Sequence, residues 1–391
     1  MNRKVLHVLI VAVFASMIGF GIMAPLLPEH AKELGANGVW IAIIGVSFSA
    51  SRGIFMPIVG KISDKTGRKR FIAVGLLIYS LLSLAYIPAD TLYSLTAVRF
   101  LHGVGSAMVI PIAMAYIGET SEKGKEGTSM GALNVAIYMG LGAGPLLGGF
   151  LNDAYGFNSA FYALAGLSGI AFVIVLAYLP ATTSLKASEE EIVPMSRIIR
   201  DDTMKGIFVF RFMNAMAFAG ALWFLPVLSD EVFDATSTQQ GLVLSADVFI
   251  TGLAQIPFGW VADRHNKLRL VLIGSLVIAL SSMFAGQAPS LWLLVVLAAA
   301  MGLGSAVSLP AASAIAVIKV GEKGGMGIQM GLLNMAMSTG MVAGPLIMGA
   351  VRDAWGIDYI FLVLGAISLL STAVFCYLSR KELKSRQLEP L

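Results

Sequence analysis

The chain has 391 residues, of which 57% are hydrophobic and only 13% are charged. Soluble proteins average about 45–50% apolar and about 25% charged residues, so a globular fold in water would leave far too much apolar surface exposed. The net charge of +4 does not indicate nucleic-acid binding, because the basic residues lie in short segments between apolar runs. The single cysteine, Cys376, excludes a disulfide framework and a cysteine-based metal site.

Twelve apolar runs approach or exceed the length of about 20 residues that crosses the hydrocarbon core of a bilayer. The first follows the basic start MNRK and continues to Pro25 without a small-residue cleavage site, so we expect a membrane helix and not a cleaved signal peptide. The runs cover residues 5–27, 39–59, 71–88, 92–117, 130–151, 158–180, 205–228, 240–261, 269–287, 290–317, 327–350 and 357–379. The sequence thus predicts an all-α membrane protein with 12 transmembrane helices.

The basic residues are distributed unevenly between the two sides of the membrane. An even number of spans puts both termini on one side, and a cytoplasmic N-terminus places 22 of the 27 Lys and Arg residues in cytoplasmic segments. Only Lys32 and Arg352 fall on the other side, and the remaining three lie inside apolar runs. By the positive-inside rule, we expect a multi-pass protein of the cytoplasmic (inner) membrane with cytoplasmic N- and C-termini.

The two halves of the chain repeat. GALNVAIYMGLGAGPLLGGFLNDAYG (131–156) matches GLLNMAMSTGMVAGPLIMGAVRDAWG (331–356) at 13 of 26 positions. Residues 103–115 match 302–314, and residues 60–70 match 259–269, both at an offset of 199. An internal duplication with six helices per copy keeps both copies in the same orientation. We therefore expect an N-terminal half over residues 1–180, a polar cytoplasmic linker over 181–204 and a C-terminal half over 205–391.

The run GLGAGPLLGG (140–149) contains five glycines in ten residues. On a helix, the spacing of four residues puts Gly140, Gly144 and Gly148 on one stripe. Gly142 and Gly149 lie about half a turn away, on the opposite face. Small residues let membrane helices approach closely, and the missing backbone donor of Pro145 is tolerated where neighbouring helices support it. The run predicts a tightly packed, bendable transmembrane helix.

Four motifs resemble the major facilitator superfamily, over essentially the whole chain. GKISDKTGRKR (60–70) resembles its signature loop, RFLHGVGSAM (99–108) its fourth-helix pattern with Arg99, Gly103 and Gly105 in place, and GLGAGPLLGG its antiporter motif in the fifth helix. GFGIMAPLLP (19–28) resembles the first helix of the twelve-helix drug/proton antiporters. The signature-loop matches are Gly60, Asp64, Gly67, Arg68 and Lys69, and the antiporter-motif residues are Gly140, Gly144, Pro145, Gly148 and Gly149.

The resemblance implies the major facilitator fold of two parallel-repeat halves, with alternating access around a site near the bilayer midplane. It implies proton-coupled export driven by a proton gradient, without a cofactor. Members of the drug/proton family often carry an acidic residue in the first or fourth helix. We expect the first helix to have none here, and Glu119 lies at the cytoplasmic end of the fourth. The resemblance therefore transfers no proton-coupling residue.

The signature loop has two interpretations. Its basic residues are a topology signal. It is also expected to act as a latch, in which Asp64 caps a facing helix and Arg68 pairs with a carboxylate such as Glu119. We favour the latch, because a charge signal does not need Gly60 and Gly67.

Ionisable residues inside the apolar runs are few and are functional candidates. Asp247 is either paired with an arginine or carries the proton, because burial favours the neutral form of a carboxyl group. Arg99 is expected to be a polar element of the fourth helix more than a substrate ligand. Snorkelling to the membrane surface is the simplest interpretation for Arg52 and Arg211. If two of these three arginines faced a cavity, an anionic substrate would fit.

Other polar groups carry less information. His102 titrates near neutral pH when exposed, but a hydrogen-bonded packing role is favoured. Tyr138, Asn214 and Gln255 are candidate cavity groups. No nucleotide-binding loop, metal-ligand spacing or nucleophile pattern is found. We predict a monomeric, non-enzymatic secondary transporter with a small-molecule substrate, protons and the lipid bilayer as partners, and no nucleic acid.

The function that we predict is proton-coupled export of small amphiphilic organic compounds or drugs. The first alternative is a transporter of a specific metabolite or lipid, including an anionic one such as an organic acid, siderophore or lysolipid. A non-transporting membrane sensor or scaffold is the second alternative, and the absence of a soluble signalling segment counts against it.

Overall fold

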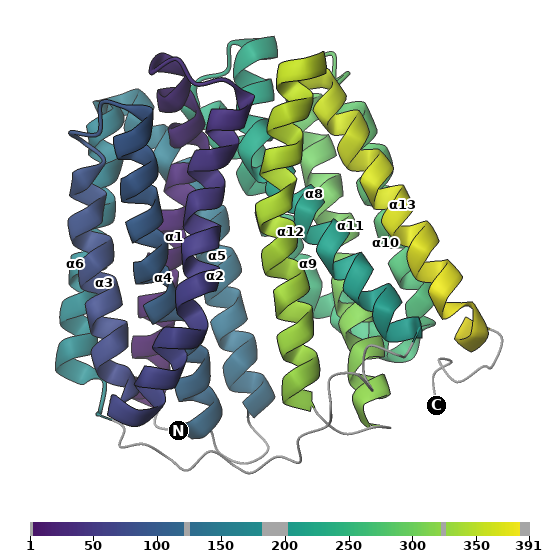
Figure 1. Cartoon of the computed structure of the whole chain (residues 1–391), viewed down its shortest axis with the longest axis horizontal. Helices are drawn as coiled ribbons and strands as arrows, with labels where there is room; N and C mark the ends of the chain where they lie inside the picture. Colours follow the sequence, from purple (N-terminus) through teal and green to yellow (C-terminus); the bar gives the residue numbers. More distant parts are fainter. Residues whose placement is uncertain (1–2, 121–125, 182–201, 322–325, 384–391) are drawn as a thin grey trace. The chain divides into compact units, whose positions relative to one another are not determined.

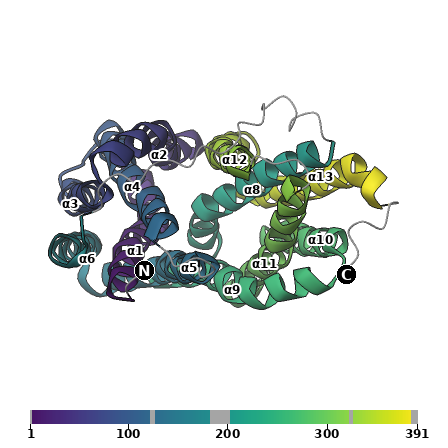
Figure 2. The same ribbon diagram turned by 90° about the horizontal axis from the view of Figure 1, so that it is seen from below.

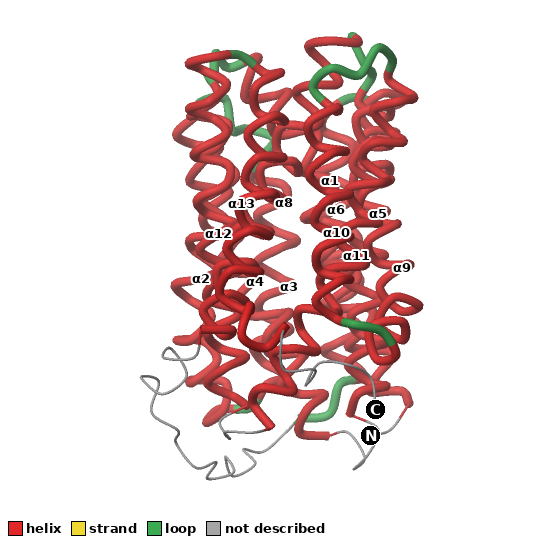
Figure 3. The backbone as a smooth tube through the Cα atoms, turned by 90° about the vertical axis from the view of Figure 1, so that its right-hand side faces the viewer, coloured by secondary structure: helices red, strands yellow, loops and turns green. Residues whose placement is uncertain are grey.

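The computed structural model describes residues 3–120, 126–181, 202–321 and 326–383. These residues form twelve α-helices, without a strand among them (Figure 3). The helices are α1 (Arg3–Glu33), α2 (Gly38–Thr66), α3 (Arg68–Ala85), α4 (Leu92–Thr120), α5 (Glu126–Tyr155), α6 (Phe157–Tyr178), α8 (Asp202–Phe233), α9 (Ser237–Arg264), α10 (Lys267–Ala285), α11 (Leu291–Gly321), α12 (Met326–Trp355) and α13 (Ile357–Leu383) (Figure 1).

Eleven of these helices are long and apolar enough to cross a membrane. The exception is α3, whose 18 residues begin with Arg68, Lys69 and Arg70, so that the whole helix carries three charges. The predicted all-α membrane fold with twelve helices is confirmed. The expected linker over 181–204 lies mostly outside the described residues, and α8 begins at Asp202, just before the predicted end of the linker.

The first helix is longer than its apolar run. α1 continues through Pro25 and Pro28 to Glu33, although residues 5–27 are the predicted span. The expectation that the first helix lacks an acidic residue is therefore wrong, because Glu29 lies within α1. A proline removes only one backbone hydrogen bond, and packing against neighbouring helices compensates for the loss in a membrane protein.

Short connections are set by local turn chemistry. Asn37 caps α2, with its side-chain oxygen accepting a hydrogen bond from the backbone N–H of Trp40 at 2.9 Å. Gly156 and Gly356 separate α5 from α6 and α12 from α13, with φ angles of +82° and +100°. Residues with a Cβ atom are strained at such angles. The two glycines are 200 positions apart, so the duplicated halves share this turn.

Packing divides the chain into two compact units. Unit 1 comprises Met1–Ala187 and Ser229–Ser245, and unit 2 comprises Ser188–Leu228 and Ala246–Leu391. In unit 1, α1 packs along α5, α2 packs on α4, and α3 packs on α4 and α6 (Figure 1). In unit 2, α10 packs against both α11 and α13 (Figure 2). The end of α8 and the start of α9 belong to unit 1, whereas the rest of each helix belongs to unit 2.

The duplication is visible in the helix contacts inside each unit. In unit 1 the backbone of Phe48 in α2 lies against Gly103 in α4, and in unit 2 the backbone of Asp247 in α9 lies against Gly302 in α11. Asp247 follows Phe48 by 199 positions, and Gly302 follows Gly103 by the same number. A side chain at either glycine would collide with backbone atoms, so each glycine permits a close crossing of two helices. Asp247 therefore has the same position in unit 2 that Phe48 has in unit 1.

Candidate functional site

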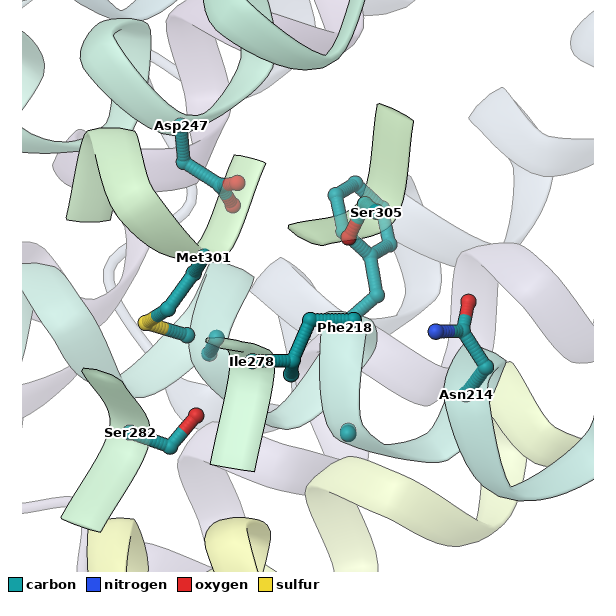
Figure 4. Close-up of a pocket in the computed structure, with 9 residues that line it drawn as sticks. Asn214, Phe218, Asp247, Ile278, Ser282, Met301 and Ser305 are labelled. Atoms are coloured by element: carbon teal, nitrogen blue, oxygen red, sulfur yellow. The ribbon is translucent and has the colours of Figure 1, made fainter. Parts of the chain in front are cut away.

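A pocket lies inside unit 2 between α8, α9, α10 and α11 (Figure 4). Its cavity volume is about 20 Å³, which is roughly the space that one water molecule needs. The lining residues are Asn214, Ala217, Phe218, Ala221, Asp247, Ile278, Ser282, Met301 and Ser305. The pocket therefore combines one carboxyl group, one amide and two hydroxyls with apolar walls.

Asp247 is the acidic group of this pocket. The residue is only 5% exposed, and Thr251 lies one turn further along α9. The Thr251 hydroxyl donates to the carbonyl oxygen of Gly302 at 3.2 Å, which fastens α9 to α11. Within the described part of the chain, no Lys, Arg or His nitrogen lies within 4.0 Å of this carboxylate. The predicted alternative of a structural Asp–Arg ion pair is thus not found among these residues.

The hydroxyl and amide groups of the pocket come from three other helices. Ser282 in α10 is fully buried, and its Oγ has no hydrogen-bond partner among the described residues. In Figure 4 the Asp247 carboxylate and the Ser282 hydroxyl extend into the space that Met301 and Ile278 border, and Asn214 and Ser305 lie on its other side. Sequence reasoning identified Asp247 and Asn214, but it missed Ser282 and Ser305, because serines are common in membrane helices. The repeat around Gly302–Ser305 was the available signal.

Arg99 lies in unit 1, in a cage of aromatic and sulfur groups. It is fully buried, and its guanidinium lies 4.6 Å from the ring centre of Phe48 and 5.3 Å from that of Phe20. Its Nη1 donates to the Sδ of Met23 at 2.8 Å. Aromatic faces attract a cation. The arrangement fits the expected role of Arg99 as a polar element of the fourth helix.

His102 is part of the same cluster. Its Nδ1 lies 3.3 Å from the Tyr86 hydroxyl, and its ring centre lies 4.0 Å from that of Tyr79. The residue is 1% exposed. These contacts fit the expected hydrogen-bonded packing role.

The other predicted pathway residues do not line the pocket. Arg211 in α8 is half-buried, and its Nη2 lies 3.6 Å from the Sδ of Met337. Gln255 is half-buried in α9, two turns beyond Asp247. Arg52 in α2 and Tyr138 in α5 are half-buried residues of unit 1. The structure therefore brings Asp247 together with Asn214 and Arg99 together with His102.

The signature loop is described only in part, since the side chains of Asp64 and Glu119 lie outside the described residues. Arg68 is 8% exposed, and its Nη1 lies 3.5 Å from the Ser63 hydroxyl. Gly67 has a φ of +97° at the junction of α2 and α3, so the turn itself requires a glycine. A Cβ added at Gly60 would meet no atom within 4 Å. The latch remains a prediction.

The glycine stripe of α5 faces α1, as its spacing predicts. Cβ atoms added at Gly140, Gly144 and Gly148 would lie 2.6 to 2.9 Å from backbone atoms of α1. The opposite face of α5 meets the start of α9: Gly149 lies against the carbonyl of Ser237, and the Ser245 hydroxyl donates to the carbonyl of Gly142 at 2.6 Å. Both glycine-containing faces of α5 therefore serve close helix packing within unit 1.

A polar cluster fastens the first turn of α9 to α5 and α1. Asp153 accepts hydrogen bonds from the backbone N–H groups of Ser237 at 3.1 Å and Thr238 at 2.8 Å, and so caps α9 from another helix. The Ser237 hydroxyl accepts from Asn152 at 2.8 Å and donates to Glu29 at 2.9 Å. Sequence reasoning missed this cluster, because single polar residues near helix ends are indistinguishable from ordinary loop residues.

An ion-pair group lies near the end of α1. Lys32 pairs with Asp230, and its Nζ lies 3.4 Å from a carboxylate oxygen of Glu231, both at the end of α8. All three side chains are partly exposed, so each pair contributes only about 0–1 kcal/mol to stability. Such contacts can form and break at little cost.

Comparison with known proteins gives a consistent picture. The model of the Major Facilitator Superfamily matches residues 9–234 and again residues 206–391. An uncharacterized MFS-type transporter of Methanocaldococcus jannaschii is 28% identical over 385 residues, covering 94% of this chain and 98% of the relative. The multi-drug resistance efflux pump PmrA of Streptococcus pneumoniae is 24% identical over 360 residues, covering 89% of each chain. The crystal structure of a bacterial homologue of the human lysosomal transporter Spinster has a TM-score of 0.83 with 12% identity, covering 98% of both chains, which shows a shared fold.

Proposed function

Because the chain belongs to the Major Facilitator Superfamily, we propose that it is a secondary active transporter that exports small amphiphilic organic compounds in exchange for protons. The observation that carries the proposal is the environment of Asp247, a buried carboxyl group that lines a pocket. No cation of the described chain lies within ion-pair distance of it. A carboxyl group inside a membrane that is not neutralised by a fixed cation is suited to bind and release a proton.

Alternating access needs contacts that form in one state and break in another. The cluster around Ser237 and the ion pairs of Lys32 have this character, because they consist of polar bonds between helix ends. We assign them to closure of the side away from the cytoplasm, and the signature loop at Gly60–Arg70 to the cytoplasmic side. This assignment uses the cytoplasmic position of both termini that the basic residues predict.

The remaining expectations complete the proposal. The protein acts as a monomer in the cytoplasmic (inner) membrane, takes its energy from the proton gradient and binds no nucleic acid. Efflux as the direction of transport is supported by the relative from Streptococcus pneumoniae, which is named as a multi-drug efflux pump. A transporter of this kind performs no chemical reaction on its substrate.

The test is a proton-exchange measurement in proteoliposomes. Purified full-length protein is reconstituted with a pH-sensitive dye inside, a proton gradient is imposed, and a panel of organic cations, neutral amphiphiles and organic anions is added one compound at a time. We expect some compounds to release protons across the membrane and Asp247→Asn to abolish this release. Asp358→Asn, which makes the same chemical change at an exposed residue of α13, is the control and is expected to behave as the unchanged protein.

Three outcomes would contradict the proposal. Normal proton exchange by Asp247→Asn would remove Asp247 from the coupling mechanism. Absence of flux with every compound would favour the sensor or scaffold alternative. Flux of organic anions alone would favour the anionic-metabolite alternative. The cage of Arg99 argues against that alternative, because its guanidinium already contacts Phe20, Phe48 and Met23.

A further inference from the structure

We propose that the pocket of unit 2 binds a compact organic cation, a guanidinium or primary ammonium group, in the place that the Arg99 side chain occupies in unit 1. The inference names a substrate class for the transport function proposed above and rests on that function. Its basis is a residue-by-residue comparison of the two units, whose helices repeat at offsets of 198 to 200 positions.

The comparison starts from contacts that the two units share. The pair Phe48–Gly103 corresponds to Asp247–Gly302 at an offset of 199. Between α1 and α8 the offset is 198. Gly144 lies against the carbonyl of Ile18 in α1, and Gly344 lies against the carbonyl of Met216 in α8. These offsets relate seven of the nine pocket residues of unit 2 to residues of unit 1: Phe218 to Phe20, Ala221 to Met23, Asp247 to Phe48, Ile278 to Tyr79, Ser282 to Ser83, Met301 to His102 and Ser305 to Ser106.

In unit 1 this region is filled by a cation of the chain itself. The guanidinium of Arg99 contacts Phe20, Phe48 and Met23, and the counterparts of all three line the pocket of unit 2. The ring of Tyr79 and that of His102 occupy further space beside it. Unit 1 thus has a cation with aromatic neighbours where unit 2 has a cavity.

Unit 2 lacks the internal cation and carries a negative group instead. Ala298 stands at the position of Arg99, and its side chain is a single methyl group that is fully buried. Asp247 stands at the position of Phe48, so a carboxylate replaces an aromatic face. Phe218 keeps the ring of Phe20. The substitutions remove a positive charge and add a negative one at the same place, which leaves the site complementary to a cation supplied from outside.

A second difference concerns the serines. In unit 1 the hydroxyl of Ser83 donates to the carbonyl oxygen of Tyr79 at 2.5 Å. The corresponding Ser282 in unit 2 is fully buried, and no described residue forms a hydrogen bond with its hydroxyl. Leaving such a group unsatisfied is unfavourable, and a ligand N–H bonded to its oxygen would satisfy it.

The chemistry of the lining selects the ligand class. Guanidinium and primary ammonium groups offer several N–H donors and no acceptor, which suits the carboxylate of Asp247, the hydroxyls of Ser282 and Ser305 and the amide oxygen of Asn214 (Figure 4). The face of Phe218 attracts a cation. The cavity of about 20 Å³ has room for one water-sized group, so an N–H-bearing end of the ligand enters it and the rest of the ligand would extend beyond the pocket.

The proposal is tested by equilibrium binding to the purified full chain in detergent, with radiolabelled guanidinium and methylammonium as probes and acetate as the anionic comparison. We expect saturable binding of one or both cations at one site and none of acetate. Asp247→Asn removes the charged partner and is expected to weaken binding at least about tenfold. Ser282→Ala is expected to weaken it by a smaller factor. Asp358→Asn is the control and should bind as the unchanged protein.

A variant that introduces an arginine into unit 2 tests the proposal independently. Ala298→Arg places in unit 2 the side chain that fills unit 1, and we expect it to abolish cation binding because its guanidinium competes for Asp247. If that variant does not fold, as judged by size-exclusion chromatography, Asp247→Asn and Ser282→Ala decide the question. Unchanged binding in Asp247→Asn, or no binding of either cation by the unchanged protein, would overturn the proposal.

The outcomes for the pocket and for transport are separable. Cation binding that is sensitive to Asp247→Asn, without proton exchange in proteoliposomes, would support the pocket and contradict the transport function. Proton-coupled flux of other compounds, without cation binding in unit 2, would support the transport function and contradict the pocket.

Discussion

Replacing Gly144 by alanine should force α1 and α5 apart. The added Cβ would lie 2.6 Å from the Cα of Gly21 and from the carbonyl oxygen of Ile18. Carbon atoms in contact prefer about 3.5–4.0 Å, so the helices must separate locally by about 1 Å. All the nearest atoms belong to the backbone, and no side-chain rotation can relieve the overlap. Overpacking of this kind costs about 1–3 kcal/mol, against about 1 kcal/mol gained because alanine favours the helix.

The assay is thermal unfolding of the purified variant in detergent, followed by circular dichroism. We expect Gly144→Ala to lower the unfolding midpoint. Gly131→Ala is the matched control, because it lies in the same helix and a Cβ there would meet no atom within 4 Å. That variant is expected to raise the midpoint slightly through helix propensity alone. A midpoint for Gly144→Ala equal to or above that of Gly131→Ala would refute the packing argument.

The remaining predictions concern α5. Gly148→Met should lower the unfolding midpoint, because its Cβ would lie 2.9 Å from the carbonyl oxygen and 3.1 Å from the Cγ2 of Ile22. Adding Ile22→Gly removes the Cγ2 and should restore part of the loss; additive effects in this double-mutant cycle would contradict the side-chain contact. Asp153→Ala removes two hydrogen bonds from the first turn of α9 and should destabilise that turn by about 1–2 kcal/mol. Hydrogen exchange of the Ser237 and Thr238 amides measures this, with Asp90→Ala at an exposed loop position as the control; unchanged protection would refute the capping role.

Much of the fold was predictable, because length and hydropathy set the position of membrane helices almost independently of tertiary contacts. The ends of the helices were less predictable from the sequence. Lipid-core length limits an apolar run, but a helix continues into the polar region for as long as its backbone bonds are satisfied, as α1 does through Pro28 to Glu33. That extension is the reason why the acidic residue of the first helix was missed.

The site was predictable only in part. Asp247 is conspicuous, because a carboxyl group inside an apolar run is costly and therefore rare. Ser282 and Ser305 carry no such signal, since their place in the pocket depends on how α10 and α11 rotate against α9. At the position of Gly148 in the antiporter motif, the second copy has Met348. The structure gives a packing reason for this difference. In unit 1, Gly148 lies against Ile22, whereas in unit 2, Met348 lies against Gly220; a Cβ added at Gly220 would be 2.8 Å from the Cγ of Met348.

The equivalent glycine contacts of the two units also order events in the history of the chain. Gly75 and Gly105 cross closely in unit 1 as Gly274 and Gly304 do in unit 2, so this crossing was already present in the six-helix ancestor before its gene was duplicated. The cage of Arg99 and the pocket of Asp247 differ between the copies and therefore arose, at least in one copy, after duplication. The ancestor was constrained by its packing, and at least one copy acquired a different chemistry beside a helix crossing that both copies retain.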